Sequence, residues 1–183
     1  MRLRGLFIIF AVLQFLSCRD KSKDQIVIEQ PIFFPMIMEI DTLNVDSLIV
    51  RETISFPTTL DGTLANNNTN KSKITSASLV NLTLVIPDYA RGDTVNYCNF
   101  KDLSEISLYV KNDANGTKLS AQKLNIPDKI MNTLNMDIAP EELRDYLRSD
   151  DFRMVVSYRK RRPMPDKLEF FIIGKFMVYA DPL

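Results

Sequence analysis

The sequence predicts a mostly β fold, an antiparallel β-sandwich of about seven to nine strands with one short helix. From Gln25 onward, short apolar segments are separated by Pro, Asn, Asp and Gly, and the clearest of them alternate apolar and polar residues. The chain has 183 residues, enough to form one domain with its own core after an N-terminal leader is removed. We therefore expect a single sandwich domain over residues 25–183.

The first element is a helix that has the pattern of an export signal. Two arginines precede a run over residues 6–16 that is apolar except at Gln14, and the small residue Ser17 ends the run directly before Cys18. This order is typical of a bacterial lipobox, in which the cysteine sulfur receives a diacylglyceryl group. We predict a lipoprotein signal peptide over residues 1–17, cleavage after Ser17 and lipidation of Cys18.

Two other interpretations of this N-terminal segment are weaker. A membrane-spanning helix needs roughly 18 or more apolar residues, and the run is shorter than that. A secreted product cut elsewhere needs an Ala-x-Ala-like site, and none follows closely. Several acyl chains on one cysteine hold a protein firmly to a bilayer, so the mature domain would need no membrane-binding surface of its own. Residues 18–24, polar after the lipidated Cys18, are predicted to form a tether.

The strands are predicted from apolar alternation and flanking turn residues. The alternation is clearest where Ile106, Leu108 and Val110 face one way, and the Asn115-Gly116 pair that follows suits a tight hairpin. In chain order, the expected strands are 26–29, 36–40, 47–56, 73–86, 105–111, 117–125, 132–137, 152–159 and 168–179.

One helix and one long loop complete the predicted domain. Pro140 stands at a first-turn position, two glutamates follow near the positive helix end, and Leu143, Tyr146 and Leu147 share one face. Residues 61–72 are too polar to pack and too poor in β-forming residues to pair, so we expect a loop there.

Composition excludes several classes of function. Removal of the signal takes away two of the 23 basic residues and none of the 23 acidic ones, leaving a net charge of about −2, which argues against nucleic acid as a partner. The chain has no histidine, which excludes Ser-His, Cys-His and His-ligated metal chemistry. With Cys18 lipidated, Cys98 has no partner for a disulfide within the chain and is interpreted as a small buried residue. We predict no metal and no cofactor.

A basic cluster is the sharpest local charge feature, and its members are Arg159, Lys160, Arg161 and Arg162. In a turn between two strands, it would suit contact with phosphate-bearing lipid or an anionic glycan. The alternative is a solvated turn whose charges discourage pairing between sheet edges.

The sequence predicts no catalytic residue. Ser120 and Lys123 match the Ser-x-x-Lys string of penicillin-binding proteins, but they lie on a predicted strand without the accompanying motifs. Glu141 and Asp145 share a helix face with two arginines, which indicates a solvated, salt-bridged face rather than paired catalytic acids.

Four segments of the C-terminal two-thirds carry a resemblance to a known group of proteins. They are Leu103-Ser-Glu-Ile-Ser-Leu-Tyr-Val110, Asn125-Ile126-Pro127, Leu134-Asn-Met-Asp137 and Leu143-Arg-Asp-Tyr-Leu-Arg-Ser-Asp-Asp-Phe152. These segments resemble strands and turns of Bacteroidota envelope lipoproteins with immunoglobulin-like β-sandwich domains. The resemblance implies the outer membrane of a Gram-negative bacterium, on its periplasmic or its surface face, and implies no catalytic or binding residues.

These observations favour a non-enzymatic, lipid-anchored protein of the cell envelope. It would contact the membrane through Cys18 and would bind or scaffold a protein or glycan partner through its sandwich. The main alternative is a structural subunit of a fimbria-like or secretion assembly that acts by strand addition, for which residues 25–40 should pack poorly in their own domain. A hydrolase that uses carboxylates alone is a third hypothesis, and it requires two acids converging on a cleft.

Overall fold

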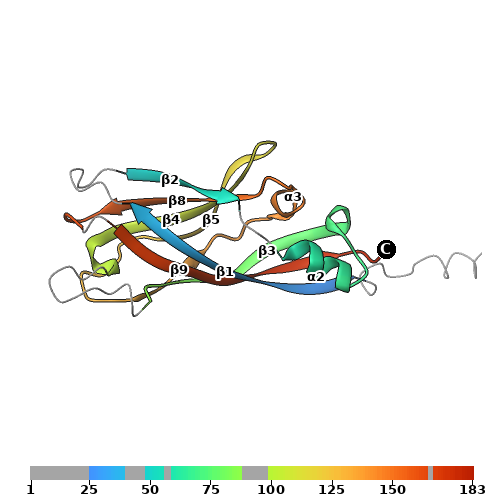
Figure 1. The fold of residues 1–183 in the computed structure, drawn as a ribbon, viewed down its shortest axis with the longest axis horizontal. Coiled ribbons are helices and arrows are strands. Elements are labelled where there is room, and N and C mark those ends of the chain that lie inside the picture. The colour runs from blue at the N-terminus through green and yellow to red at the C-terminus, as the bar shows by residue number, and fades with distance from the viewer. Residues whose placement is uncertain (1–24, 40–47, 56–58, 88–98, 165–166) are drawn as a thin grey trace, which may run out of the picture.

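The described part of the chain folds into two packed antiparallel sheets. The structure is a computed structural model that describes residues 25–39, 48–55, 59–87, 99–164 and 167–183. Over these residues it shows nine strands and short helices (Figure 1), which confirms the predicted antiparallel β-sandwich. The predicted signal peptide, Ser17, Cys18 and Cys98 lie outside the described residues. In the described ranges, no helix is long and apolar enough to cross a membrane.

The two sheets have four and five strands. The four-stranded sheet runs in the order β1 (Ile26–Glu39), β9 (Lys167–Ala180), β3 (Ile74–Val85) and β6 (Thr133–Asn135). The five-stranded sheet runs in the order β2 (Leu48–Ser55), β8 (Arg153–Lys160), β4 (Leu103–Asn112), β5 (Gly116–Lys123) and β7 (Asp137–Ile138). The helical elements are α2 (Leu60–Asn66), α3 (Arg144–Leu147) and two single 3₁₀ turns, Lys71–Lys73 and Phe100–Asp102.

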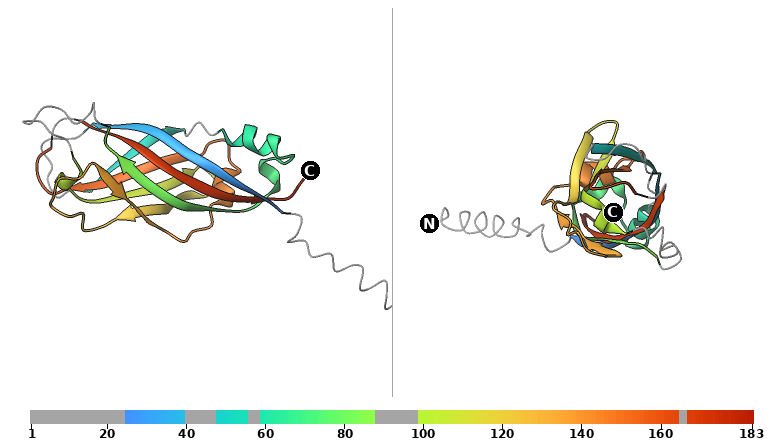
Figure 2. Two further views of the ribbon diagram at one scale, coloured as in Figure 1. Left: turned by 90° about the horizontal axis from the view of Figure 1, so that it is seen from below. Right: turned by 90° about the vertical axis from the view of Figure 1, so that its left-hand side faces the viewer.

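The longest strands set the length of the molecule. β1 and β9 pair without a register shift from Ile26 opposite Ala180 to Glu39 opposite Lys167, so the sandwich is about 45 Å long at about 3.3 Å per residue. We call the end at Ile26 and Ala180 the proximal pole and the end at Glu39 and Lys167 the distal pole. The C terminus follows Ala180 at the proximal pole (Figure 2).

One side of the sandwich is closed by the segment of chain that crosses from the four-stranded to the five-stranded sheet. β6 pairs with β3 in one sheet, and β7, which starts two residues after β6 ends, pairs with β5 in the other. Met136 lies between them and is 7% exposed. On the opposite side, β1 and β2 are the edge strands of the two sheets.

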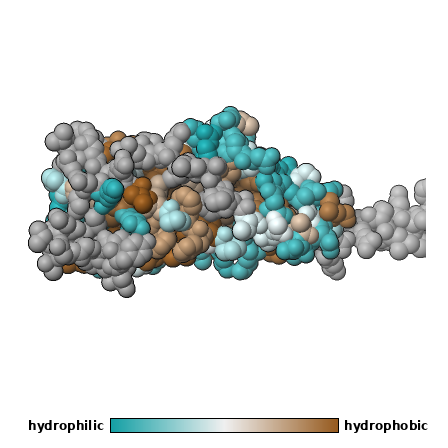
Figure 3. Space-filling model, viewed as in Figure 1, coloured by the Kyte–Doolittle hydropathy of each residue, from teal (hydrophilic) through white to brown (hydrophobic). Residues whose placement is uncertain are grey.

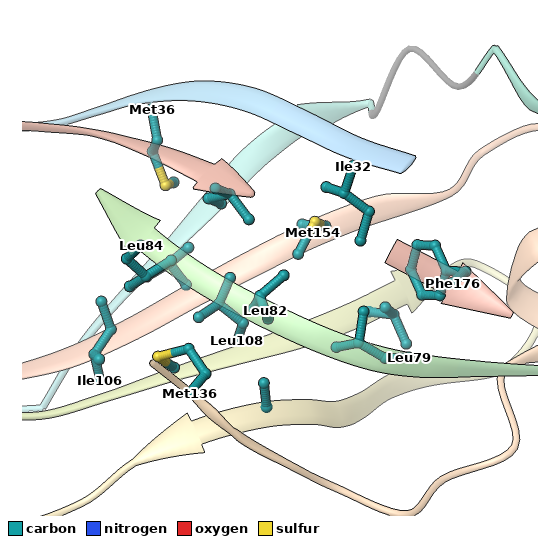
Figure 4. Packing of buried hydrophobic residues seen from close by; sticks show 14 of the residues in the cluster. Ile32, Met36, Leu79, Leu82, Leu84, Ile106, Leu108, Met136, Met154 and Phe176 are labelled. Atoms are coloured by element: carbon teal, nitrogen blue, oxygen red, sulfur yellow. The ribbon is translucent and has the colours of Figure 1, made fainter. Parts of the chain in front are cut away.

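The core lies between the sheets and follows the predicted alternation. Ile106, Leu108 and Val110 of β4 are fully buried, and they pack in one cluster with residues such as Ile32 and Leu84 from the facing sheet (Figure 4). The predicted hairpin is also confirmed. Gly116 has a φ of 70°, and Asn115 N–H donates to Asn112 Oδ1 at 2.7 Å in the turn between β4 and β5.

The first strand is longer than predicted. Residues 26–29 and 36–40 were expected to form separate strands, but β1 runs continuously through Pro31 and Pro35. Proline lacks the N–H that a sheet ladder uses and is therefore confined to edge strands, where that group would face away from the neighbouring strand. β1 is such an edge strand, so both prolines are accommodated.

The prediction of a loop over residues 61–72 is wrong. This segment contains most of α2 and one 3₁₀ turn. Leu60 and Leu64, four residues apart, are each 1% exposed and join the core, so tertiary burial stabilises a helix of low intrinsic propensity. The Asn70 side chain accepts the Ser72 N–H at 3.0 Å and caps the 3₁₀ turn.

The predicted C-terminal helix is shorter than its sequence pattern suggested. Only Arg144–Leu147 is helical, but the expected apolar residues Leu143, Tyr146 and Leu147 are buried. Glu142 fastens this turn to β3, because its carboxylate accepts the Ser76 hydroxyl at 2.6 Å and the Ala77 N–H at 2.7 Å. The Arg144 N–H donates to the same carboxylate at 2.9 Å.

Glu142 should make the stability of the fold depend on pH. Burial raises the pKa of its carboxyl, but the hydrogen bonds from Ser76, Ala77 and Arg144 outweigh burial and lower the pKa below its ordinary value of 4.5. A carboxyl with a lowered pKa stabilises the folded state above that ordinary value, and this contribution is lost as the pH falls through the folded pKa.

We expect Glu142→Gln to lower the free energy of unfolding by about 0.5–1 kcal/mol at pH 7, a modest value because the residue is exposed and screened by solvent. The difference from the unmodified protein should shrink as the pH is lowered to about 3. Denaturant titrations at several pH values would measure it, and Glu141→Gln is the control, since Glu141 contacts Lys118 at the surface. A difference that stays constant between pH 7 and 3 would contradict the assigned role.

Candidate functional site

The basic cluster of residues 159–162 lies at the distal pole, where β8 ends and the chain turns toward β9. Arg161 stabilises this turn through hydrogen bonds. Its guanidinium donates to the carbonyl oxygen of Lys101 at 2.6 Å and to that of Ile126, and its backbone N–H donates to the carbonyl oxygen of Asp102 at 2.8 Å. Arg161 therefore fastens the turn to two neighbouring segments.

The other members of the cluster are also engaged within the domain. Arg162 lies 3.5 Å from the Asp102 carboxylate and pairs with Asp128, and Arg159 donates to Glu105 at 3.1 Å. Lys160 is fully buried.

The acidic residues beside the cluster neutralise much of its charge. Burial raises the pKa of the Asp102 carboxyl, while the cations Lys101 and Arg162 act in the opposite direction. With Glu105 and Asp128 also in contact with arginines, contact between this cluster and an anionic surface stays a prediction.

The position of the basic cluster limits which membrane surface it can contact. Cys18 and Ile26 are eight residues apart, so the chain between them spans at most about 28 Å. The cluster lies near Lys167, about 45 Å from Ile26 along the strands. An anchor at Cys18 would therefore direct the cluster away from the bilayer that holds it when the sandwich stands upright.

The outer face of the four-stranded sheet carries an exposed apolar surface. We define the outer apolar surface as Phe33, Pro35 and Ile37 of β1 with Phe171 and Ile173 of β9, which are joined by the pairs Phe33–Ile173 and Pro35–Phe171. The exposed fractions of Phe33, Ile37 and Ile173 are 66%, 61% and 38%. The Phe33 and Phe171 rings stack with centroids 4.9 Å apart.

Polar residues border the outer apolar surface. On its proximal side, Lys175 pairs with Glu29 at 3.0 Å, and toward β6 the Thr83 hydroxyl contacts Asn135 Oδ1 at 3.1 Å. Hydrophobic residues are visible in the region of β1 and β9, whereas hydrophilic residues dominate toward the end that carries the C terminus (Figure 3). An apolar centre with a polar rim is the usual anatomy of a protein interface.

Comparisons with known proteins add no functional assignment to this surface. Neither protein-family models nor curated proteins match this chain.

The β1 segment packs well, contrary to the expectation from strand addition. Ile28, Ile32 and Met36 are 4%, 1% and 5% exposed, and β1 pairs with β9 over its whole length. Over the described residues 25–39, the poor packing that the strand-addition alternative requires is therefore contradicted. The reason is that this strand is apolar on both faces, so one face fills the core while the other contributes to the outer apolar surface.

Side chains that match catalytic strings have ordinary structural partners. Ser120 is 1% exposed and its hydroxyl donates to the Leu108 carbonyl oxygen at 2.9 Å, while Lys123 pairs with Asp137 at 3.0 Å. Glu141 pairs with Lys118 and Asp145 with Arg144, at 3.0 and 2.9 Å. Within the described ranges, no three His, Cys, Asp or Glu side chains are grouped so that they could hold a metal ion.

The outer apolar surface was not predicted from the sequence, although a signal for it is present there. Alternation identifies a strand with one buried face, but residues 31–38 and 170–173 are apolar at every position. A strand that is apolar on both faces is either covered on both sides or exposed on one. The edge position of β1 and the absence of a third layer over the described residues of this sheet make it exposed here.

Proposed function

We propose that the protein is a non-enzymatic, lipid-anchored protein of the cell envelope that binds a partner through the outer apolar surface. The observation that carries the proposal is the exposure of Phe33, Ile37 and Ile173 on one face of the four-stranded sheet. Contiguous exposed apolar patches on soluble domains mark interaction sites, because their burial in a complex is favourable at about 25 cal/mol per Å².

A protein partner fits this surface better than a glycan. Phe33 and Phe171 offer ring faces and Ile37 and Ile173 offer aliphatic carbon, none of which forms hydrogen bonds with sugar hydroxyls. Polar groups are confined to the rim, in pairs such as Glu29 with Lys175. The surface therefore matches an apolar protein face.

Introduction of a charged side chain into the outer apolar surface is expected to prevent binding of the partner. In the full-length chain, Phe33→Glu should reduce recovery of cross-linked envelope partners at least tenfold, because the carboxylate would have to be desolvated in the interface. Ile130→Glu is the matched control, since Ile130 is also 66% exposed but lies in the loop after β5. Cross-linking in intact cells followed by affinity isolation and mass spectrometry would measure recovery. Equal recovery from the two variants would argue against this surface.

Lipid attachment has its own test. We expect Cys18→Ala to move the protein from the detergent phase to the aqueous phase in a detergent phase separation and to abolish labelling by radioactive palmitate, because no other cysteine lies near the predicted cleavage site. Cys98→Ala, which alters the other cysteine of the chain, should leave both properties unchanged. Palmitate incorporation into the Cys18→Ala protein would exclude the proposed anchor.

A further inference from the structure

We propose that the partner which covers the outer apolar surface is a second copy of this chain. The inference rests on the proposed function, because it takes that surface as the binding site and the lipid as the anchor. Two copies anchored in one membrane have their proximal poles on the same side. A symmetric pair whose proximal poles point the same way has its two-fold axis parallel to the strands. When this axis lies in front of the outer apolar surface, the outer faces of the two copies meet.

The strand register shows what such an axis brings together. If the axis runs along the line midway between β1 and β9, β1 of each copy lies over β9 of the other. Each residue then lies opposite the second copy's equivalent of its own cross-strand partner. Phe33 then lies opposite Ile173 of the second copy, and Pro35 lies opposite Phe171, because these residues are already partners across the two strands. Apolar residues therefore meet apolar residues in these two rows, and two sheets packed at about 10 Å exclude water from them. At the distal edge of the surface, Ile37 lies opposite Glu169 of the second copy, because these two residues are also partners across the strands.

The charged pair at the proximal rim of this face is compatible with a second copy of the chain. Glu29 and Lys175 pair at 3.0 Å within one chain, from β1 and β9. Because β1 of each copy lies over β9 of the other, Lys175 of each copy is diagonally opposite Glu29 of the other. The four charges therefore alternate in sign. A face with an unbalanced charge would repel its own copy, and this pair removes that obstacle at the proximal rim.

The size of the surface predicts a weak pair. In this arrangement β3 lies opposite no strand of the second copy, so the covered area consists of residues 29–37 of β1 and 169–177 of β9. This area is about 30 Å by 10 Å, or about 300 Å² in projection on each copy, which is below the usual size of a stable protein interface. Confinement of both copies to one membrane raises their effective concentration and compensates for low intrinsic affinity. The pair should therefore be abundant in membranes and dissociate on dilution in detergent.

The experiment uses two differently tagged full-length chains expressed together and cross-linked in intact cells. Isolation through one tag should recover the other tag, at least tenfold less when both chains carry Phe33→Glu, and undiminished with Ile130→Glu. Thermal melting of each variant shows whether the sandwich is folded. Recovery of the second tag at the same level from the Phe33→Glu chains would overturn the inference.

A charge exchange tests the arrangement itself. A chain with both Glu29→Lys and Lys175→Glu keeps the pair within each copy, so its fold should be unaffected. Two such chains should associate as well as two unmodified chains, whereas one of each should associate several-fold less, because like charges would then be diagonally opposite. Equal recovery in all three combinations would overturn the arrangement.

Other occupants give different outcomes. Recovery of a different envelope protein that depends on Phe33, without the second tag, would overturn this inference while supporting the proposed function. Flotation of the Cys18→Ala chain with phospholipid vesicles, lost in Phe33→Glu, would assign the face to the bilayer and overturn it as well. Recovery of neither the second tag nor any Phe33-dependent partner would overturn both proposals.

Discussion

Replacement of Phe176 by alanine should lower the free energy of unfolding by about 3–5 kcal/mol, the range for removal of a buried phenyl ring from a core. Phe176 is 1% exposed in β9, and its ring meets that of Phe152 edge to face with centroids 6.2 Å apart. Because β9 pairs with both β1 and β3, its backbone is held on two sides and cannot collapse into the space that the ring vacates. Most of the cavity should therefore remain.

Denaturant unfolding followed by circular dichroism would measure this loss. Met177→Ala is the control, because Met177 is the next residue of the same strand and lies on the outer face, half-buried. It removes a side chain of similar length without opening a core cavity, so we expect a loss of less than about 1.5 kcal/mol. Losses of similar size for the two variants would show that the core around Phe176 is not packed as described.

Replacement of Gly174 by alanine should destabilise the sandwich by about 2–3 kcal/mol or more, because the added methyl group has no space. A Cβ atom at this position would lie 2.4 Å from the carbonyl oxygen of Asn81 and 3.2 Å from the Cα of Leu82, both backbone atoms of β3. The register of β3 against β9 shifts between Leu79 and Asn81, beside this contact. Glycine therefore permits the irregular pairing, and alanine would force the two strands apart.

Gly62→Ala is a matched control with the opposite expected sign. Gly62 lies in α2, and no heavy atom lies within 4 Å of a Cβ atom built there. Alanine is favoured over glycine in a helix by about 1 kcal/mol, so this variant should be as stable as the unmodified protein or slightly more stable. Thermal and chemical denaturation of both variants would measure the difference. An unchanged stability for Gly174→Ala would mean that β3 and β9 approach less closely than described.

Local signals predicted much of the sheet architecture. The alternation around Ile106, Leu108 and Val110 gave a strand with the correct buried face, and Asn115-Gly116 gave the correct hairpin. These features depend on neighbouring residues alone, since side chains alternate along any strand and a tight turn needs residues that adopt positive φ. The positions of most other strands could be predicted for the same reason.

The candidate site could not be predicted in the same way. The basic cluster was conspicuous in the sequence, yet Asp102, Glu105 and Asp128, which pair with it, are far from it along the chain. The outer apolar surface depends on Phe33 and Ile173 lying in one row although 140 positions separate their numbers. Neither arrangement follows from local composition.

The sequence by itself determined the strands of the core, the hairpin and the predicted lipid-anchor motif at Cys18. Only the tertiary structure decided that α2 is a helix, that β1 is one edge strand with a packed inner face, and that the opposite face is exposed. The physical reason is the range of the interactions. Turn and strand preferences act between neighbouring residues, whereas burial, ion pairing and edge position depend on which distant strand lies alongside.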